Sequence, residues 1–324
     1  GGCRLFRTRD GWMALNLPRD EDWELIPALL GEPAGDWEAI LRLAATRERN
    51  ALLAQARLLG LAAAADETPA AGPAFTMARL GSAPSRHAVP LVVDMSSLWA
   101  GPLAGALLAA VGARVVKVES RRRPDGARLG DKTFYDLLNA GKASVALDLT
   151  VPEDRRRLGR LIDTADIVIE SARPRALLQM GIDAADAARR GATWIAITAH
   201  GRAGEAGDWI GYGDDAGVAA GVSAAMARAW GAPLFAGDAI ADPLTGITAA
   251  VAGWASWRNG GGHLISLALS QVAAHAARLH EASDVRAWQT LAASDDRPLY
   301  PLRVPPGAAR SLGADSATVL ETPG

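Results

Sequence analysis

Short apolar runs alternate with helical patterns from residue 89 to about residue 280, and this alternation constrains the fold more than any other feature. The expected strands are 90–94, 114–119, 143–148, 166–170, 194–198 and 263–268, and the expected helices are 102–111, 152–164, 174–180, 214–228, 243–257 and 270–281. Buried parallel strands typically appear as short, continuous apolar runs. The pattern therefore predicts an α/β fold: a doubly wound, Rossmann-like, mostly parallel sheet, accompanied by a small α+β domain.

Changes in sequence pattern along the chain predict four segments. Residues 1–66 are expected to form the small domain, with a strand at 13–17 and helices at 21–30 and 36–63, the second broken near Thr46. Residues 67–88 are rich in proline and glycine and predict a linker. The Rossmann-like domain would then occupy 89–283, and a C-terminal segment, 284–324, would wrap the surface.

The charge balance excludes some classes of partner. A formal net charge of −2 gives no electrostatic reason to expect nucleic acid or an anionic membrane as a partner. No apolar run is long enough to span a membrane, and no signal peptide is visible, so the sequence predicts a cytoplasmic protein. Cys3 is the only cysteine, which excludes an internal disulfide and a cysteine-based zinc site, and no metal site is predicted.

Asp242 is the strongest candidate for a chemical role. It follows a short apolar stretch and precedes Pro243 and a long alanine-rich helical pattern, so it is expected at the helix N-cap with Pro243 at the first helical position. The helix dipole favours negative charge there. An ionised carboxylate at that point can act as a nucleophile, and an ordinary capping aspartate is the alternative. Asp214 and Asp215 open another alanine-rich helix, where at least one is expected to cap it.

Two arginine-rich turns leave the same predicted edge of the sheet. Arg121, Arg122 and Arg123 follow the second strand of the Rossmann-like domain, and Arg173 and Arg175 follow the fourth. Ligands of such sheets bind at the carboxyl ends of the strands, and arginine binds phosphate through two parallel hydrogen bonds. The turns are typical of a site for a polyanion, with solvated charged turns as the alternative. The glycines after the first strand lack the spacing of a dinucleotide fingerprint.

Six motifs carry a family resemblance. They are VDMSSLWAGP at 93–102, GARVVKVE at 112–119, NAGKASVALD at 139–148, ADIVIE at 165–170, GDDAG at 213–217 and AIAD at 239–242. In this order they resemble the family III CoA-transferases, which include formyl-CoA transferase, carnitine CoA-transferase and α-methylacyl-CoA racemase. The resemblance covers about residues 90–280, and residues 312–320 are similar to the C-terminal segment of the family.

The resemblance implies an enzyme that moves CoA from an acyl-CoA donor to a carboxylic acid. Asp242 would be the catalytic nucleophile, forming first an anhydride and then an aspartyl-CoA thioester. Coenzyme A and acyl-CoA would be substrates, with no tightly bound cofactor, and the chain would form a homodimer. The matching CoA-binding positions are Leu98, Trp99, Ala100, Arg121, Arg122, Leu147, Ser171, Ala172, Arg173, Met180 and, beside the reacting carboxylate, Asp214.

Departures from the family pattern leave alternatives open. Gly213 stands where the racemase branch has a histidine, which favours transfer over racemisation of acyl-CoA. Gln179 stands where many members have an arginine for the CoA phosphates, and Arg173 or Arg175 would substitute for it. A non-catalytic CoA-binding homologue is the third interpretation. Residues 8–66 resemble the small domain of the family but precede the Rossmann-like segment, so the chain is either circularly permuted or cut from a longer, duplicated protein.

Overall fold

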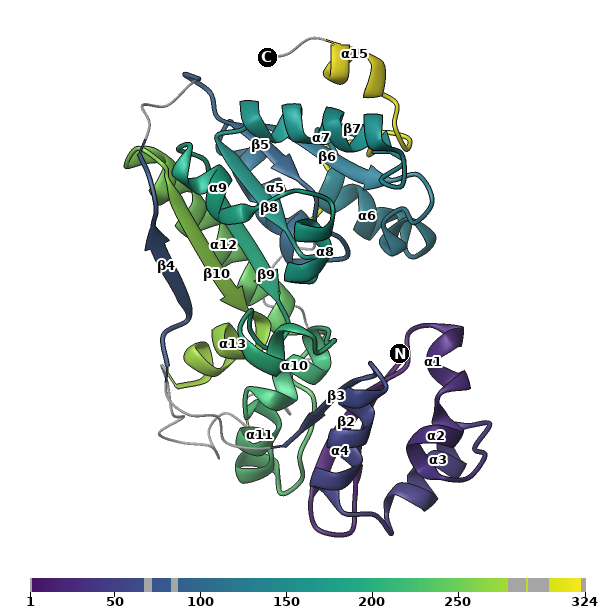
Figure 1. Ribbon diagram of the computed structural model, residues 1–324. Helices are drawn as coiled ribbons and strands as arrows, with labels where there is room; N and C mark the ends of the chain where they lie inside the picture. Colours follow the sequence, from purple (N-terminus) through teal and green to yellow (C-terminus); the bar gives the residue numbers. More distant parts are fainter. Residues whose placement is uncertain (1, 67–71, 83–86, 279–289, 291–302, 322–324) are drawn as a thin grey trace. The chain divides into compact units, whose positions relative to one another are not determined.

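The structure is a computed structural model that describes residues 2–66, 72–82, 87–278, 290 and 303–321 (Figure 1). Its contacts divide the chain into two compact units, each assembled from separate stretches of sequence. The first unit contains residues 1–74, 198–244 and 268–297, and the second contains 75–197, 245–267 and 298–324. The two units alternate along the chain, so each contains a different set of residues from the domains expected at 1–66 and 89–283.

The second unit is built on a seven-stranded sheet with the order β4-β10-β9-β8-β5-β6-β7 (Figure 1). Pairing is parallel between β5 and β6, β5 and β8, β6 and β7, and β8 and β9, and antiparallel between β4 and β10. The predicted α/β class with a mostly parallel sheet is therefore confirmed. The strands are β4 (Phe75–Arg79), β5 (Leu91–Asp94), β6 (Arg114–Ser120), β7 (Ala143–Leu147), β8 (Ile167–Glu170), β9 (Thr193–Thr198) and β10 (His263–Ala268).

Helices pack on both faces of this sheet because neighbouring residues of each buried strand point to opposite sides. Val168 of β8 joins a core that also includes Leu158 of α7 and Ala187 of α9. Ile169 points the other way, towards Gly101 of α5. The helices of this unit are α5 (Ala100–Ala110), η1 (Gly126–Leu129), α6 (Lys132–Asn139), α7 (Pro152–Thr164), α8 (Pro174–Gln179), α9 (Ala184–Arg189) and α15 (Ser316–Glu321).

The strand order reverses at β5, since β6 lies on one side of it and β8 on the other. Chain segments that leave β5 and its neighbours therefore diverge at their carboxyl ends. Such a switch point is where open α/β sheets bind ligands. The turns after β5, β6 and β8, which the sequence singled out, all leave this edge of the sheet.

The first unit contains a three-stranded antiparallel sheet in the order β1-β2-β3. Its elements are β1 (Cys3–Arg7), β2 (Trp12–Asn16), α1 (Asp20–Glu24), α2 (Ile26–Leu30), α3 (Trp37–Ala44), α4 (Arg49–Leu58) and β3 (Ala62–Ala65). The break expected near Thr46 is confirmed by the gap between α3 and α4. The expectation that this helical pattern continues to residue 63 was wrong, because the alanines from 62 to 65 form a fully buried strand.

Further described elements of the first unit are η2 (Gly204–Gly207), α10 (Gly213–Ala219), α11 (Val222–Trp230) and α13 (Leu269–Arg278). α10 contacts both β2 and β3, and α11 and α13 contact α10. The single helix expected at 214–228 is two helices, because Gly221 adopts the left-handed conformation with φ 77° and separates α10 from α11. The end of the helix expected at 270–281 lies outside the described residues.

Two further expectations require correction. The segment expected as a linker contains β4, an edge strand that pairs with β10. Helix α12 (Ala241–Arg258) begins two residues earlier than expected, so Asp242 is its second residue. Helices α6 and α9 were not expected. The described part of the C-terminal segment lies along β7, where Ser144 N–H donates to Asp315 and Ala146 N–H to the Ser316 hydroxyl.

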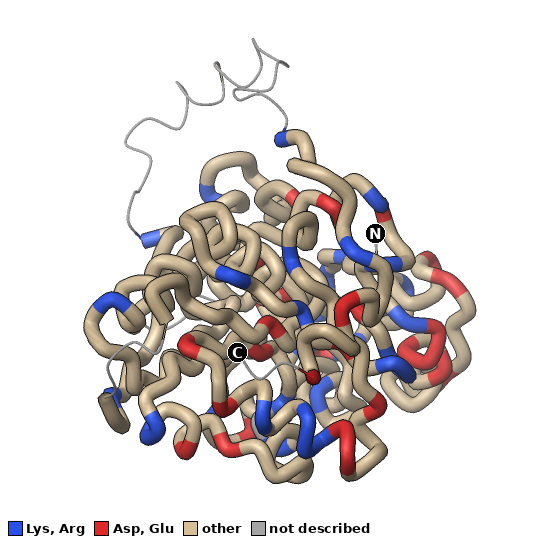
Figure 2. The backbone as a smooth tube through the Cα atoms, turned by 90° about the horizontal axis from the view of Figure 1, so that it is seen from above, with Lys and Arg blue, Asp and Glu red and all other residues tan. Residues whose placement is uncertain are grey.

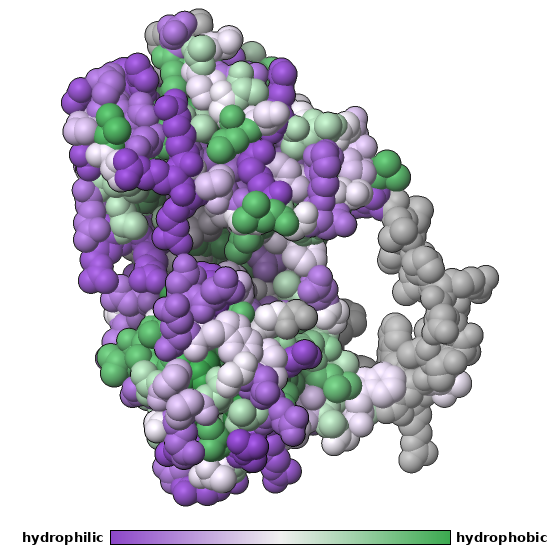
Figure 3. Space-filling view, turned by 90° about the vertical axis from the view of Figure 1, so that its right-hand side faces the viewer, coloured by the Kyte–Doolittle hydropathy of each residue, from purple (hydrophilic) through white to green (hydrophobic). Residues whose placement is uncertain are grey.

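The surface carries charges of both signs. Figure 2 shows Lys and Arg interspersed with Asp and Glu along the described backbone. In the space-filling view, hydrophobic residues form separate patches among hydrophilic ones (Figure 3). Among the described helices, none has the length and apolar character needed to cross a membrane.

Candidate active site

Asp242 lies in the first turn of α12, and its side chain is partly buried. A turn at residues 237–240 leads into the helix, and Asp242 N–H donates to Ala239 O at 2.8 Å. This bond extends the helical backbone past the expected boundary, which is why the residue is not the N-cap. The electrostatic argument is unaffected, because the helix dipole acts over the whole first turn.

Gly213 lies directly against the Asp242 carboxylate. A Cβ atom at position 213 would overlap Asp242 Oδ2, and it would lie 2.5 Å from Ala239 O and 2.7 Å from Ala239 Cβ. The Asp242 carboxylate thus occupies the space where a side chain at position 213, the position of the histidine in the racemase branch, would begin. Gly213 is the first residue of α10, so the start of this helix faces the candidate nucleophile.

Asp214 braces the turn that precedes α12. Its Oδ1 accepts the N–H of Ala239 at 2.9 Å, and Ala239 adopts a positive φ of 45°. Such a conformation is uncommon for a residue with a side chain and needs support from its surroundings. Burial raises the pKa of Asp214 above its ordinary value, although the bond from Ala239 opposes this. The structure therefore brings Asp214 and Asp242 to the two sides of one turn.

Asp215, the next residue, caps α10 from inside the fold. Its Oδ1 accepts the Tyr212 N–H at 2.9 Å and the Asn16 side-chain amide at 3.4 Å. Burial raises the pKa of this carboxyl to about 7. The expectation that at least one of the two aspartates caps the helix is confirmed for Asp215. Asn16 comes from β2, so this carboxyl ties α10 to the three-stranded sheet.

His200 is a second buried titratable group beside Asp215. Its Nε2 lies 3.9 Å from Asp215 Oδ2, and neither atom has a hydrogen-bond partner within the described residues. Burial lowers the pKa of His200 to about 4, and the charge of Arg57 adds to this. Gly211 lies directly against both groups, because a Cβ there would lie 2.7 Å from Asp215 Oδ2 and 2.9 Å from His200 Nε2.

In the second unit, the turn between β5 and α5 carries Leu98, Trp99 and Ala100. Leu98 is 40% exposed and adopts a positive φ of 69°. That conformation costs a branched residue on the order of 1–3 kcal/mol and persists only where neighbours hold it. Trp99 packs edge-on against Phe134, with ring centroids 4.9 Å apart. Ala100 begins α5 and is buried.

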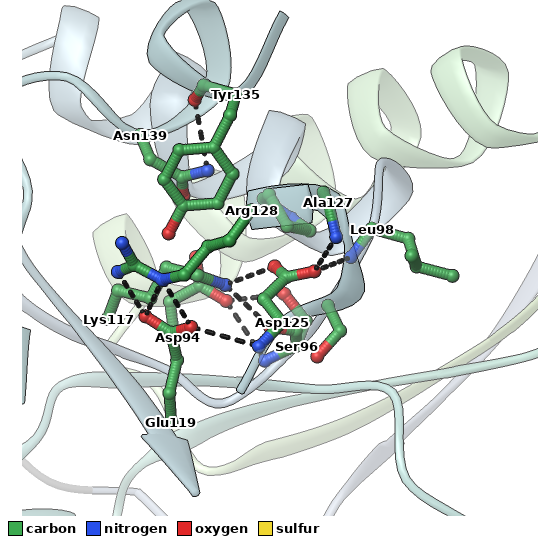
Figure 4. Close-up of polar contacts among 12 residues, drawn as sticks. Asp94, Ser96, Leu98, Lys117, Glu119, Asp125, Ala127, Arg128, Tyr135 and Asn139 are labelled. Atoms are coloured by element: carbon green, nitrogen blue, oxygen red, sulfur yellow. Dashed lines mark hydrogen bonds and ion pairs between the residues drawn. The ribbon is translucent and has the colours of Figure 1, made fainter. Parts of the chain in front are cut away.

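A buried polar network lies beneath this turn (Figure 4). Lys142 Nζ contacts Asp94 Oδ2 at 2.8 Å, and the Ser96 hydroxyl donates to the other oxygen of Asp94. Lys117 Nζ lies 2.9 Å from Asp125 Oδ2, and both side chains are almost fully buried. Burial lowers the pKa of Lys142 to about 8. Sequence reasoning missed this network, although a lysine inside the apolar run VVKV was a signal for a buried partner.

The turn after β6 carries Arg121 and Arg122. Arg121 N–H donates to Leu147 O at 2.8 Å, and its Nε donates to Ala146 O at 3.1 Å. Arg122 is exposed and pairs with Asp148 at 2.9 Å. Leu147 is fully buried, so its side chain presents no surface to a ligand. The Leu147 carbonyl oxygen supports the turn that carries Arg121, which differs from the ligand contact implied by the resemblance.

The turn after β8 carries the remaining predicted positions. Ser171 Oγ accepts the Ser97 N–H at 3.2 Å, which joins this turn to the β5–α5 turn. Ala172 N–H donates to Glu170 at 2.8 Å. Arg173 is exposed and precedes α8. Met180 ends α8 and packs against the core of the sheet.

The predicted site residues thus form two groups, one in each unit. Gly213, Asp214 and Asp242 meet in the first unit, and the predicted CoA-binding positions from Leu98 to Met180 lie around the switch point of the sheet in the second. Helix α12 begins in the first unit and continues into the second. Within the described residues, no group of three or more His, Cys, Asp or Glu side chains is arranged to hold a metal ion.

Comparison with known families identifies the chain. Residues 90–297 match CoA-transferase family III. The chain belongs to this family. The match includes the six sequence motifs, the parallel strands β5 to β9 and helix α12 with Asp242.

Curated relatives support the assignment. The succinate–glutarate CoA-transferase of Agrobacterium fabrum is 32% identical over an alignment 200 residues long that covers 56% of this chain and 50% of that protein. The probable fatty acyl-CoA transferase Rv3272 of Mycobacterium tuberculosis is 31% identical over an alignment 196 residues long that covers 56% of this chain and 50% of that protein. The chain spans about half the length of the curated relatives it matches.

Solved structures share the fold. The crystal structure of Rv3272 superposes with a TM-score of 0.54 at 31% identity and covers 61% of this chain and 58% of its own. A CaiB/BaiF family protein from Brucella suis has a TM-score of 0.53 at 24% identity, covering 67% of this chain and 59% of its own. The second likeness concerns the fold alone.

Proposed function

We propose that the protein transfers CoA from an acyl-CoA to a carboxylic acid, with the Asp242 carboxylate as covalent nucleophile. The observation that carries the proposal is the position of Asp242, in the first turn of α12 and directly against Gly213. The helix dipole favours the ionised form of a carboxylate there. Carboxylates that form covalent intermediates are an established class of enzyme nucleophile.

The proposed reaction has four acyl-transfer steps. Asp242 attacks the thioester carbonyl carbon, and CoA leaves as a thiolate, which gives a mixed anhydride. The thiolate attacks the aspartyl carbonyl carbon and releases the donor acid, which leaves an aspartyl-CoA thioester. The acceptor carboxylate attacks that thioester and forms a second anhydride with loss of the thiolate. The thiolate then attacks the acceptor's carbonyl carbon, which yields the new acyl-CoA and regenerates Asp242.

The surroundings of Asp242 suit these steps. Gly213 has no side chain between the carboxylate and the start of α10. Asp214 fixes the preceding turn by accepting the N–H of Ala239. A nucleophile held in one place needs less reorganisation on the way to the transition state. In the proposal, the turns after β5, β6 and β8 bind CoA, with Arg121, Arg122 and Arg173 near the phosphates.

The same contact favours transfer over racemisation. A racemase needs two groups that exchange a proton at the α-carbon on opposite faces. Position 213 carries no side chain, and Asp242 occupies the space where one would begin. Exchange of the α-hydrogen for deuterium in D₂O, catalysed by the wild type and retained in Asp242→Asn, would favour racemisation instead.

An isotope experiment tests the nucleophile. The chain is incubated with succinyl-CoA and acetate labelled with ¹⁸O in its carboxylate. The mass of the proteolytic peptide that contains Asp242 is then measured by mass spectrometry. In the proposed scheme, the bridging oxygen of the second anhydride stays with the aspartate, so label from acetate accumulates in Asp242. Turnover without label in that peptide rejects the mechanism.

Two variants serve as matched comparisons. Asp242→Asn should abolish transfer and labelling, while Asp238→Asn, at an exposed position in the adjoining turn, should keep both. CoA binding by the wild type without any label exchange between acyl-CoA and acids would identify a non-catalytic CoA-binding homologue. A panel of dicarboxylic and fatty acids as acceptors would define the substrate class.

We also propose that the chain forms a homodimer. Helix α12 exposes Ile247 and Val251, which lie one turn apart and are 51% and 65% accessible. An apolar helix face of this kind suits a contact between subunits. Val251→Asp should shift the mass measured by light scattering towards the monomer, and Val304→Asp, at another exposed valine, should leave it unchanged. A monomeric wild type contradicts the proposal.

A further inference from the structure

We propose that the buried Lys117–Asp125 ion pair is a positioning device that holds two turns of the candidate CoA site in one fixed arrangement. The first turn comprises residues 95–99 between β5 and α5, and the second comprises residues 121–127 after β6 (Figure 4). The inference rests on the proposed function, because these are the turns expected to contact CoA. Lys117 lies within one of the six sequence motifs and Asp125 in none, and neither was predicted as a site residue.

Asp125 belongs to the second turn but bonds to the first. Its Oδ1 accepts the N–H of Leu98 at 3.0 Å and the N–H of Ala127 at 3.0 Å. One carboxylate oxygen therefore joins a backbone donor of each turn. Asp125 is only 3% exposed, so water cannot readily replace these bonds.

Lys117 holds the other end of the first turn. Its Nζ donates to Ser96 O at 2.8 Å and lies 2.9 Å from Asp125 Oδ2. The ammonium and the carboxylate thus grip the first turn at Ser96 and at Leu98. A buried ion pair is worth little to stability compared with apolar residues of similar size, and its best-attested role is to fix one arrangement.

Glu119 and Arg128 hold the second turn in place. Glu119 Oε1 accepts the N–H of Asp125 at 3.0 Å, and Arg128 binds the same carboxylate through Nε at 2.9 Å and through its terminal nitrogen at 2.6 Å. The Arg128 guanidinium also lies 4.7 Å from the ring centroid of Tyr135 in α6. Asp125 is therefore fixed at its backbone as well as at its side chain.

The conformation of Leu98 shows what the pair holds in place. Leu98 is one of two non-glycine residues with positive φ among those described, and its side chain is partly exposed at the ligand edge of the sheet. Without the bond to Asp125, a leucine would relax towards negative φ. The turn would then have to be reordered when CoA binds, and that cost lowers affinity. The device should act on binding and leave the chemical steps unchanged.

The test replaces the pair by neutral residues, so that no charge is left buried alone. In Lys117→Met/Asp125→Ala, hydrogen exchange at the amides of residues 95–99 should rise while the amides of β5 and β6 stay protected. The Kd for CoA, measured by calorimetry, should rise about tenfold. The KM for acyl-CoA should rise with it, and kcat should stay within about twofold of the wild type.

A double-mutant cycle with Leu98→Gly distinguishes positioning from general damage. Glycine adopts positive φ without strain, so loss of the pair should cost less affinity in the Leu98→Gly background. An equal loss in both backgrounds overturns the proposal. Glu153→Gln/Arg156→Met removes an exposed ion pair of α7 and should leave exchange and affinity unchanged.

If the neutral pair does not fold, Asp125→Asn provides the second test, because it keeps an oxygen for the two N–H groups and removes the charge of the carboxylate, while Lys117 stays in place. It should raise the Kd about threefold. Unchanged exchange at residues 95–99, or unchanged affinity, overturns the proposal in either variant. A wild type that does not bind CoA refutes the proposed function and the affinity part of this inference, while the exchange data still decide whether the pair holds the turns.

Discussion

Asp215→Asn should make the protein more stable at pH 8, although it alters a fully buried residue. Asp215 Oδ1 accepts two hydrogen bonds, and an asparagine oxygen can accept both. The other oxygen has no hydrogen-bond partner among the described residues and lies 3.9 Å from His200 Nε2. The amide nitrogen of an asparagine at that point could donate to the unprotonated imidazole. The substitution thus removes a buried charge and adds a donor where one is missing.

The direction of the pH dependence follows from the raised pKa. Burial raises the pKa of Asp215 from 3.8 to about 7. Below pH 3.8 the carboxyl is protonated in both states and carries no penalty. As the pH rises from 3.8 towards 7, the unfolded chain ionises while the folded chain stays protonated, so stability is lost. The penalty is complete above about pH 7.

The magnitude follows from about 1.4 kcal/mol per pKa unit. The difference between the ordinary pKa of 3.8 and the folded-state pKa of about 7 lowers the free energy of unfolding by about 4 kcal/mol at pH 8. At pH 5 the penalty should be only about 2 kcal/mol. The free energy of unfolding of Asp215→Asn should therefore exceed that of the wild type by about 4 kcal/mol at pH 8 and by about half of that at pH 5. The nearby His200 acts in the opposite direction, because its pKa of about 4 lowers stability as the pH falls below 6.5 in both proteins.

Urea denaturation followed by circular dichroism at pH 5 and pH 8 measures the difference between the variant and the wild type. Glu205→Gln, at an exposed carboxylate of the same unit, serves as the matched control. The reasoning is refuted if Asp215→Asn is less stable than the wild type at pH 8. It is also refuted if the difference between the two proteins is the same at both pH values, because the burial of a charge would then not be its cause.

Further predictions concern glycines with different surroundings. Gly213→Ala should reduce kcat at least about a hundredfold, because its Cβ would displace the Asp242 carboxylate, whereas Gly217→Ala in the same helix meets only Ile240 at 3.4 Å and should keep activity. Gly101→Ala should destabilise the second unit by about 2–4 kcal/mol in thermal unfolding, because its Cβ would overlap a side chain of the β5–α5 turn. Gly159→Ala has open space around it in α7 and should stabilise by about 0.5–1 kcal/mol, and a loss of stability there would contradict this.

The parallel strands were predictable because burial on both faces demands continuous apolar runs. The runs around Val93, Val116 and Val168 gave strands close to their observed limits. β4 was missed because an edge strand has one solvated side and this one is exposed over most of its length. β3 was missed because alanine favours helices, and packing against β2, α4 and α10 makes this segment a strand.

The candidate site was predictable in its residue types but not in its contacts. The Asp-Pro signature placed Asp242 at the start of a helix, within two residues of the observed boundary. The contact with Gly213 joins residues far apart in the chain and leaves no local trace in the sequence. The Lys117–Asp125 pair was equally hidden, because a charged residue is normally expected on the surface. A lysine between valines signals burial but does not name its partner.

The contacts of the first unit bear on the order expected from the sequence, in which the small domain precedes the Rossmann-like segment. In this unit α10 packs against β2 and β3, and Asn16 bonds to Asp215, two residues after Gly213. Cys3, Ala14, Ala64 and Val218 form one small buried cluster across the same contact. These interactions need the three-stranded sheet next to α10 but do not depend on which of them comes first in the chain. A small domain placed before the Rossmann-like segment can therefore brace the helix that faces Asp242 as well as one placed after it.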